Sequence, residues 1–118
     1  MDKLLSMAGL AYKAGKLKAG TDSVLDSVRS AKPPCLVLVA KDISENAYKK
    51  IRDGCSYHGV EYIQINGNMS ELGNAAGGRS GVACAAVLDK GFADRIKELA
   101  NNMGGSSSAG GRLNDSKR

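Results

Sequence analysis

A continuous apolar run, CLVLVA at residues 35–40, constrains the fold of this chain more than any other segment. The run is short and lies between Pro33-Pro34 and Lys41-Asp42. A strand with one face in water alternates apolar and polar residues, whereas a strand with no polar position is covered on both faces. The run therefore predicts the central strand of a sheet that carries helices on both faces.

The segments around this run alternate between helical and extended patterns. Apolar positions three and four residues apart predict helices, and short apolar or alternating runs predict strands. In chain order we expect a helix at 2–14, an extended piece at 16–19, a helix capped by Thr21, the strand at 35–40, a helix from Ser44 to about residue 59, a strand at 60–65, a short helix at 70–76 opened by Ser70, a strand at 81–88 and a helix at 90–102. This order indicates an α/β domain with a layer of helices on each face of one sheet.

The composition changes near residue 103. The segment MGGSSSAGGRLNDSKR is rich in Gly and Ser and has no hydrophobic periodicity. Such a sequence does not bury enough apolar surface to order itself. We therefore expect one domain at 1–103 and a flexible, basic tail at 104–118. A solvated extension is the favoured interpretation of this tail, and nonspecific contacts of Arg112, Lys117 and Arg118 with a polyanion are the alternative.

The charge of the chain favours a polyanionic partner. The net charge is +5 over 118 residues, and residues 1–32 hold six Lys or Arg against three Asp. For a small basic protein the usual polyanion is nucleic acid. The N-terminus has no signal-peptide pattern, and no apolar run approaches the roughly 18 residues of a membrane span. We expect a cytoplasmic protein that does not enter a membrane.

Few residues suit catalysis or metal binding. His58 is the only histidine, and Cys35, Cys55 and Cys84 include no C-x-x-C pair, so the cysteines are interpreted as small buried side chains. Asp42 follows a strand end, where α/β enzymes often keep catalytic groups, but it lacks companion residues and is interpreted as a loop or helix-capping residue. The stretch AAGGRSG lacks the glycine order of a dinucleotide motif. We expect no enzyme, no cofactor and no metal.

A binding surface is better supported than an active site. The segment GKLKAGTDSVLDSVR, residues 15–29, places Lys16 and Lys18 before Gly20, and a helical pattern begins at Thr21. A helix N-terminus presents unpaired N–H groups and about half a positive charge, which suit a phosphate or the edge of a base. Gly20 has no Cβ, so a partner can approach its backbone closely. On local sequence alone, the same residues also fit a helix cap that follows a turn.

Three segments together resemble the kink-turn RNA-binding ribosomal protein family that includes L7Ae and L30e. GKLKAGTDSVLDSV resembles the family motif G-K-x-x-x-G-T-N-E-x-x-K, and CLVLVAKDIS resembles the family's strand and acidic-ended loop. LGNAAGGRSGVACAAV is similar to the family's L-G-x-A-x-G segment with the loop and strand that follow it. The distances between these blocks also fit, and the resemblance covers residues 2–100. Within the family, the chain looks most like the small bacterial YlxQ-like proteins.

The resemblance implies a three-layer α-β-α sandwich around a four-stranded mixed sheet. It also implies a non-catalytic, ribosome-associated protein, which we expect to be a monomer. Family members place the N-terminus of the second helix against a sharply bent RNA loop, and the loop before the last strand packs on bases that flip outward. We therefore expect this chain to bind a bent or kink-turn-like structured RNA. The RNA-binding residues that the resemblance implies are Lys16, Lys18, Gly20, Thr21, Asp22, Ser23, Gly78, Arg79 and Ser80. We expect Lys41 to join them by neutralising the RNA backbone.

Four positions depart from the family pattern. Ala19 occupies a position that is frequently Lys in the family. Asn, Glu and Lys are usual at the positions of Asp22, Ser23 and Asp26, respectively. Ionised Asp only accepts hydrogen bonds, whereas Asn also donates them, and Asp26 replaces a phosphate contact with repulsion. These departures motivate an alternative hypothesis, a protein-interaction module of the same fold that has lost specific kink-turn recognition.

Overall fold

The computed structural model describes residues 3–102 of the chain. The elements are α1 (Lys3–Lys13), β1 (Leu17–Ala19), α2 (Thr21–Arg29), β2 (Leu36–Val39), α3 (Glu45–His58), β3 (Tyr62–Gln64), α4 (Met69–Ala75), β4 (Cys84–Val87) and α5 (Lys90–Asn102). This is the predicted order of helices and strands. Among residues 3–102, no helix is long and apolar enough to span a membrane. The tail predicted at 104–118 lies outside the described residues.

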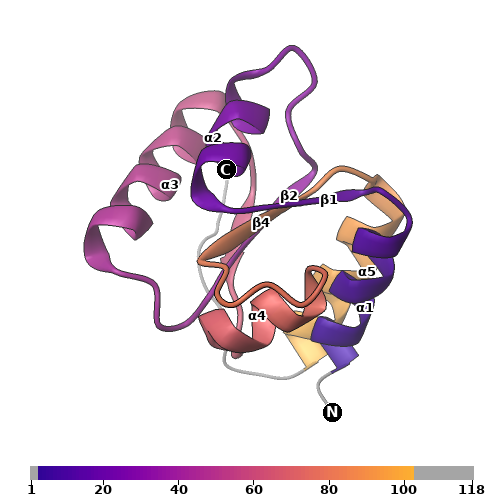
Figure 1. Cartoon of the computed structure of the whole chain (residues 1–118). Helices are drawn as coiled ribbons and strands as arrows, with labels where there is room; N and C mark the ends of the chain where they lie inside the picture. The colour runs from indigo at the N-terminus through magenta and orange to yellow at the C-terminus, as the bar shows by residue number, and fades with distance from the viewer. Residues whose placement is uncertain (1–2, 103–118) are drawn as a thin grey trace.

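The strands form one mixed sheet in the order β1-β4-β2-β3 (Figure 1). β4 is antiparallel to both β1 and β2, and β2 is parallel to β3. Ala85 of β4 lies opposite Ala19 of β1 on one side and opposite Leu38 of β2 on the other. The chain therefore leaves β1 and β2 at the end of the sheet where it enters β4.

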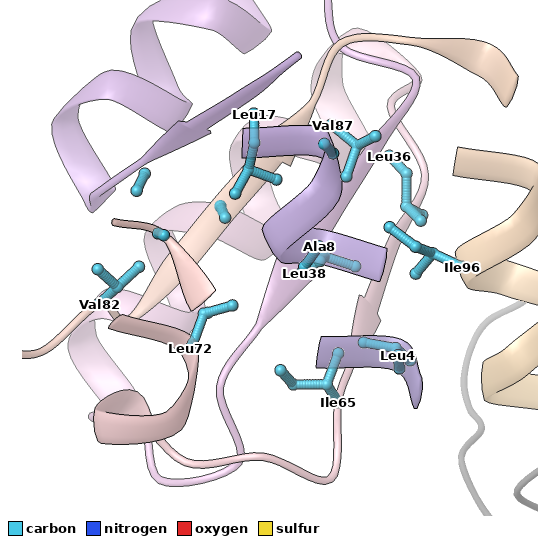
Figure 2. Packing of buried hydrophobic residues seen from close by; sticks show 14 of the residues in the cluster. Leu4, Ala8, Leu17, Leu36, Leu38, Ile65, Leu72, Val82, Val87 and Ile96 are labelled. Carbon is cyan, nitrogen blue, oxygen red and sulfur yellow. The ribbon is translucent and has the colours of Figure 1, made fainter. Parts of the chain in front are cut away.

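Helices cover both faces of this sheet. Helices α1, α4 and α5 pack on one face, and α2 and α3 pack on the other (Figure 1). Figure 2 shows the first core, in which Ala8 of α1, Leu72 of α4 and Ile96 of α5 gather around Leu38. The fold is thus the expected three-layer α-β-α sandwich with a four-stranded mixed sheet.

The β2 strand shows why residues 35–40 are uniformly apolar. All four of its residues are fully buried. Leu36 and Leu38 point into the core beneath α1, α4 and α5, while Val37 and Val39 point into the core beneath α2 and α3. Because successive side chains of a strand point to opposite faces, a strand between two helix layers needs apolar side chains at every position.

The starts of two helices differ from the predicted caps. Thr21 is the first residue of α2, and the N-cap position belongs to Gly20, which has no side chain to cap with. Helix α4 begins before Ser70, because Asn68 and Glu71 form a capping box. The Asn68 side chain accepts the Glu71 N–H at 2.8 Å, and the Glu71 carboxylate accepts the Asn68 N–H at 2.9 Å. The reciprocal pair satisfies two helix donors at once, which a single Ser cannot do. The cap predicted for α3, Ser44, is confirmed by its bond with the Ala47 N–H.

Candidate nucleic-acid interface

The N-terminus of α2 opens at the end of β1 with unoccupied backbone donors. Gly20 has a φ of 106°, in the range that favours glycine, and its carbonyl oxygen accepts the first helical bond, from the Val24 N–H at 2.9 Å. No side chain caps this helix. Within residues 3–102, the N–H groups of Thr21, Asp22 and Ser23 have no hydrogen-bond acceptor. These donors, together with the helix dipole, can bind an anion or a base acceptor.

A buried thiol supports Thr21 from inside the domain. Cys84 is the first residue of β4, and its Sγ donates to the Thr21 Oγ1 at 3.9 Å. Burial raises the pKa of the Cys84 thiol to about 11, so the group stays protonated and remains a donor at neutral pH. The Thr21 hydroxyl keeps its own proton for a ligand. The sequence indicates only a buried position for Cys84, because its place beside Gly20 depends on the pairing of β1 with β4.

The second segment of the candidate site is the α4–β4 loop, residues 76–83. Its start is held by the carbonyl oxygen of Gly73. That oxygen accepts bonds of 2.9 to 3.2 Å from three N–H groups of the loop, those of Ala76, Gly78 and Arg79. Further along the loop, the Val82 N–H donates to the Met69 carbonyl oxygen at 3.1 Å. The loop is thus fixed to α4 at both ends, although residues 77–81 are exposed.

Arg79 brings the α4–β4 loop against the start of α2. Its Nη1 donates to the carbonyl oxygen of Ala19, the residue before Gly20, at 3.5 Å. The Gly20 N–H in turn donates at 2.9 Å to the carbonyl oxygen of Cys84, the residue after the loop. Segments separated by 60 positions therefore meet at one end of the sheet (Figure 1). Residues 20–23 and 78–80 together are termed the α2–loop surface.

The three predicted lysines lie at different distances from this surface. Lys18 is exposed in the middle of β1, and it points to the face of the sheet that carries α2, since Leu17 and Ala19 enter the opposite core. Lys41 follows β2 at the same end of the sheet as Gly20, with β4 between them. Lys16 lies at the other end of β1, roughly 13 Å from Gly20 at strand spacing.

These lysines are exposed and available to a ligand. The ion pairs among residues 3–102 lie within α3, within α5, and between Lys97 and Glu61. None of those pairs involves Lys16, Lys18 or Lys41. Their positive charge is therefore not neutralised by a carboxylate of the described chain.

Asp42 and the cysteines have structural roles. One carboxylate oxygen of Asp42 accepts the Met69 N–H at 2.8 Å, so this side chain caps α4, which confirms its interpretation as a capping residue. Cys55 and Cys84 are buried, as predicted, and Cys35 is half-buried. All three are free thiols. Burial, together with the neighbouring Cys84, raises the pKa of Cys55 to about 12.

The chain is similar in sequence to bacterial and ribosomal proteins. It is 37% identical over 93 residues to "RNA-binding protein YlxQ" of Bacillus subtilis (strain 168), which covers 79% of this chain and 90% of that protein. It is 35% identical over 97 residues to the protein of the same name from Enterococcus faecium, which covers 82% of this chain and 90% of the relative. Large ribosomal subunit protein eL30 of Euphorbia esula is 31% identical over 98 residues, or 83% of this chain and 87% of its own length.

Solved structures have the same fold. A Bacillus halodurans protein of unknown function superposes with a TM-score of 0.76 at 29% identity, covering 84% of this chain and 97% of that one. A Giardia lamblia 15.5kD RNA binding protein superposes with a TM-score of 0.68 at 22% identity, covering 84% of this chain and 82% of its own, and this likeness concerns the fold. Residues 2–97 match the pattern of a single protein family. The chain belongs to the ribosomal protein L7Ae/L30e/S12e/Gadd45 family.

Proposed function

We propose that this chain is a non-catalytic, cytoplasmic RNA-binding protein that acts with the ribosome as a monomer and binds a sharply bent, kink-turn-like internal loop of RNA. The observation that carries the proposal is the hydrogen bond between Arg79 and the Ala19 carbonyl oxygen, which joins the α4–β4 loop to the start of α2. A bent RNA brings phosphates and unpaired bases close together. The α2–loop surface offers both ligands a donor. The names of the Bacillus subtilis and Enterococcus faecium relatives support the same class of partner.

The elements of the surface suit different parts of an RNA. The free N–H groups of Thr21, Asp22 and Ser23 suit a base acceptor or one phosphate oxygen. Arg79 uses one of its five donors on the Ala19 carbonyl oxygen, and the others remain for a phosphate. Lys18 and the more distant lysines add attraction that weakens steeply with salt.

The acidic positions of α2 weaken this surface for a standard kink-turn. Asp22 and Asp26 are both exposed in the first two turns of α2. A hydrogen bond to a charged group contributes about 1.5 to 3 kcal/mol, so two lost contacts lower the affinity roughly 10²- to 10⁴-fold. Asp22→Asn together with Asp26→Lys should therefore tighten binding of a standard kink-turn RNA.

A filter-binding titration at low salt tests the proposal, with a kink-turn RNA and a straight duplex of the same length as probes. The unmodified protein should prefer the bent RNA. Lys16→Glu with Lys18→Glu should weaken its binding while the melting temperature of the protein stays nearly constant, because both side chains are exposed and neither forms an ion pair within residues 3–102. Lys49→Glu with Lys50→Glu, exposed on α3, makes the same charge change at residues outside the predicted site and should have a smaller effect. Equal affinities of the unmodified protein and the first double variant would contradict the proposal.

The alternative function is a protein-interaction module, favoured by the exposed Asp22, Ser23 and Asp26 at the start of α2. A pull-down from lysate with and without nuclease separates the two functions. Partners that disappear after nuclease treatment support RNA binding. Partners that persist, together with no preference for the bent RNA, would favour the alternative.

A further inference from the structure

Tyr12, in the last turn of α1, lies directly against the α4–β4 loop. A Cβ added to Gly77 would be 2.6 Å from the Tyr12 hydroxyl oxygen and 2.7 Å from Cζ, so the phenol end of the ring contacts the Gly77 backbone. One turn earlier on α1, Gly9 approaches the Ala75 carbonyl oxygen, which would be 3.5 Å from a Cβ at Gly9. Helix α1 therefore runs beside the end of α4 and the first residues of the loop.

The ring is not enclosed by these contacts. Tyr12 is 38% exposed, and Lys13 and Lys16 beside it are exposed as well. Gly15 has a φ of 74°, and the Lys16 N–H donates to the Ala11 carbonyl oxygen at 2.8 Å, so the chain turns back and keeps Lys16 close to the end of α1. In the described part of the chain, neither lysine forms an ion pair. A partly exposed aromatic residue thus lies at the same end of α1 as two exposed lysines.

The α4–β4 loop connects this cluster with the α2–loop surface. The loop contacts Tyr12 at Gly77, and two residues later Arg79 donates to Ala19. Gly77 and Arg79 are two residues apart, so the two contact points lie within roughly 7 Å of each other along the backbone of the loop. An RNA strand seated on the loop at Arg79 therefore needs to extend only roughly 7 Å along the loop to reach the residue that contacts Tyr12.

We propose that Tyr12, together with Lys13 and Lys16 at the same end of α1, is a second RNA contact, at which an unpaired base stacks on the exposed part of the ring and the lysines bind the adjoining phosphates. This inference rests on the proposed RNA-binding function and extends its surface onto α1. Stacking fits the chemistry, because any base presents a π-face to an aromatic side chain and a cationic surround holds the backbone. The cluster also gives Lys16 a role at its actual position, away from the start of α2.

Two substitutions of Tyr12 test this contact. Tyr12→Leu removes the ring and keeps an apolar side chain, whereas Tyr12→Phe keeps the ring. Titration with a bent RNA that carries unpaired nucleotides should give a roughly 5- to 150-fold loss of affinity for Tyr12→Leu, the range found for loss of one stacked base. Tyr12→Phe should stay within about twofold of the unmodified protein. Leu10→Ala is the matched control, since Leu10 is 51% exposed on the same helix, roughly 200° around its axis from Tyr12.

Direct measurements distinguish base stacking on Tyr12 from a purely structural role of this residue. In the unmodified protein, the Tyr12 ring resonances should shift when RNA is added, and the loss caused by Tyr12→Leu should vanish with an RNA whose bases are all paired. If the ring resonances do not shift when RNA is added, and the Arg79 amide exchanges faster in Tyr12→Leu, then Tyr12 only supports the loop and the stacking proposal is wrong. If Lys18→Glu weakens bent-RNA binding but Tyr12→Leu does not, only this inference fails. If the unmodified protein shows no preference for bent RNA, the proposed function fails and this inference with it.

Discussion

Replacing Gly73 with alanine should displace the α4–β4 loop from α4. A Cβ at this position would lie 2.5 Å from the Arg79 carbonyl oxygen and 3.2 Å from the Gly81 nitrogen. Both are backbone atoms, so no side-chain rotation relieves the contact. Because Cβ atoms essentially never lie within 3.0 Å of such an atom, the loop has to move by about 0.5 Å or more at Arg79.

Three effects determine the size of the change. Alanine in a helix interior is more favourable than glycine by about 0.5–1 kcal/mol. Overpacking against the loop costs about 1–3 kcal/mol. The shift also weakens the bonds from the Gly78 and Arg79 N–H groups to the Gly73 carbonyl oxygen, each worth about 1 kcal/mol. The net loss is about 2 kcal/mol of unfolding free energy, which lowers the melting temperature by roughly 8–16 °C.

Thermal denaturation followed by circular dichroism measures this loss, and Gly54→Ala provides the matched control. Gly54 also lies inside a helix, but a Cβ there would meet only Leu25 Cδ2, at 3.2 Å, the end of a flexible side chain. This control should leave the melting temperature within about 4 °C of the unmodified protein, or raise it. A melting temperature of Gly73→Ala at or above that of the unmodified protein would refute the reasoning from the loop contacts.

Three further outcomes follow from buried or capping groups. Asp42→Ala should lower the melting temperature by roughly 4–8 °C in the same assay, because the Met69 N–H loses its acceptor. Asp42→Asn keeps an acceptor oxygen and should lower the melting temperature less. Equal decreases for the two variants would mean that the hydrogen bond is not the cause. At pH 8, iodoacetamide should modify Cys84 at least roughly tenfold more slowly in the folded protein than in the urea-unfolded protein, since burial raises the pKa of Cys84 from near 9 to about 11, and mass spectrometry that found equal rates would contradict this protection. Because burial raises the pKa of Cys84, its thiol loses the proton at a lower pH in the unfolded chain than in the folded protein. Urea denaturation should therefore show the free energy of unfolding falling from about pH 9 to pH 11, by up to about 1.4 kcal/mol per pH unit for each such thiol, and a slope unaltered by Cys84→Ala would exclude this thiol as a source.

The layered fold could be predicted because its constraints are local. A strand buried on both faces leaves an unbroken apolar run, and each flanking helix shows its own apolar spacing. The cap of α4 was also present in the sequence, since Asn68 and Glu71 stand at capping-box spacing, but Ser70 is an equally good capping residue type on its own. At the start of α2, Thr21 is the more common type of capping residue and is therefore predicted as the cap, whereas Gly20 occupies the cap position.

The contacts that assemble the candidate site could not be predicted in this way. Arg79 meets Ala19, and Cys84 meets Thr21, across 60 and 63 positions of sequence. Each contact depends on β4 lying between β1 and β2, which no spacing of apolar residues encodes. The contact of Tyr12 with Gly77 likewise needs α1 to pack beside α4. Sequence alone therefore predicts the segments of the candidate site, but it does not predict the sheet order that brings them together.

In the proposed function, the acidic start of α2 and the positions of the lysines together determine how the protein attracts RNA. A carboxylate in the first turn of a helix stabilises the helix, because it lies near the positive end of the dipole. Asp22 therefore favours the free protein and opposes an incoming phosphate at the same point. In the proposed function, the attraction for RNA then comes from Arg79 in the loop and the lysines along β1, with which Asp22 forms no ion pair within residues 3–102. Because Lys and Arg side chains bind mainly to phosphates, we expect RNA binding by this surface to depend strongly on salt and on the shape of the RNA, and only weakly on the sequence at the bend.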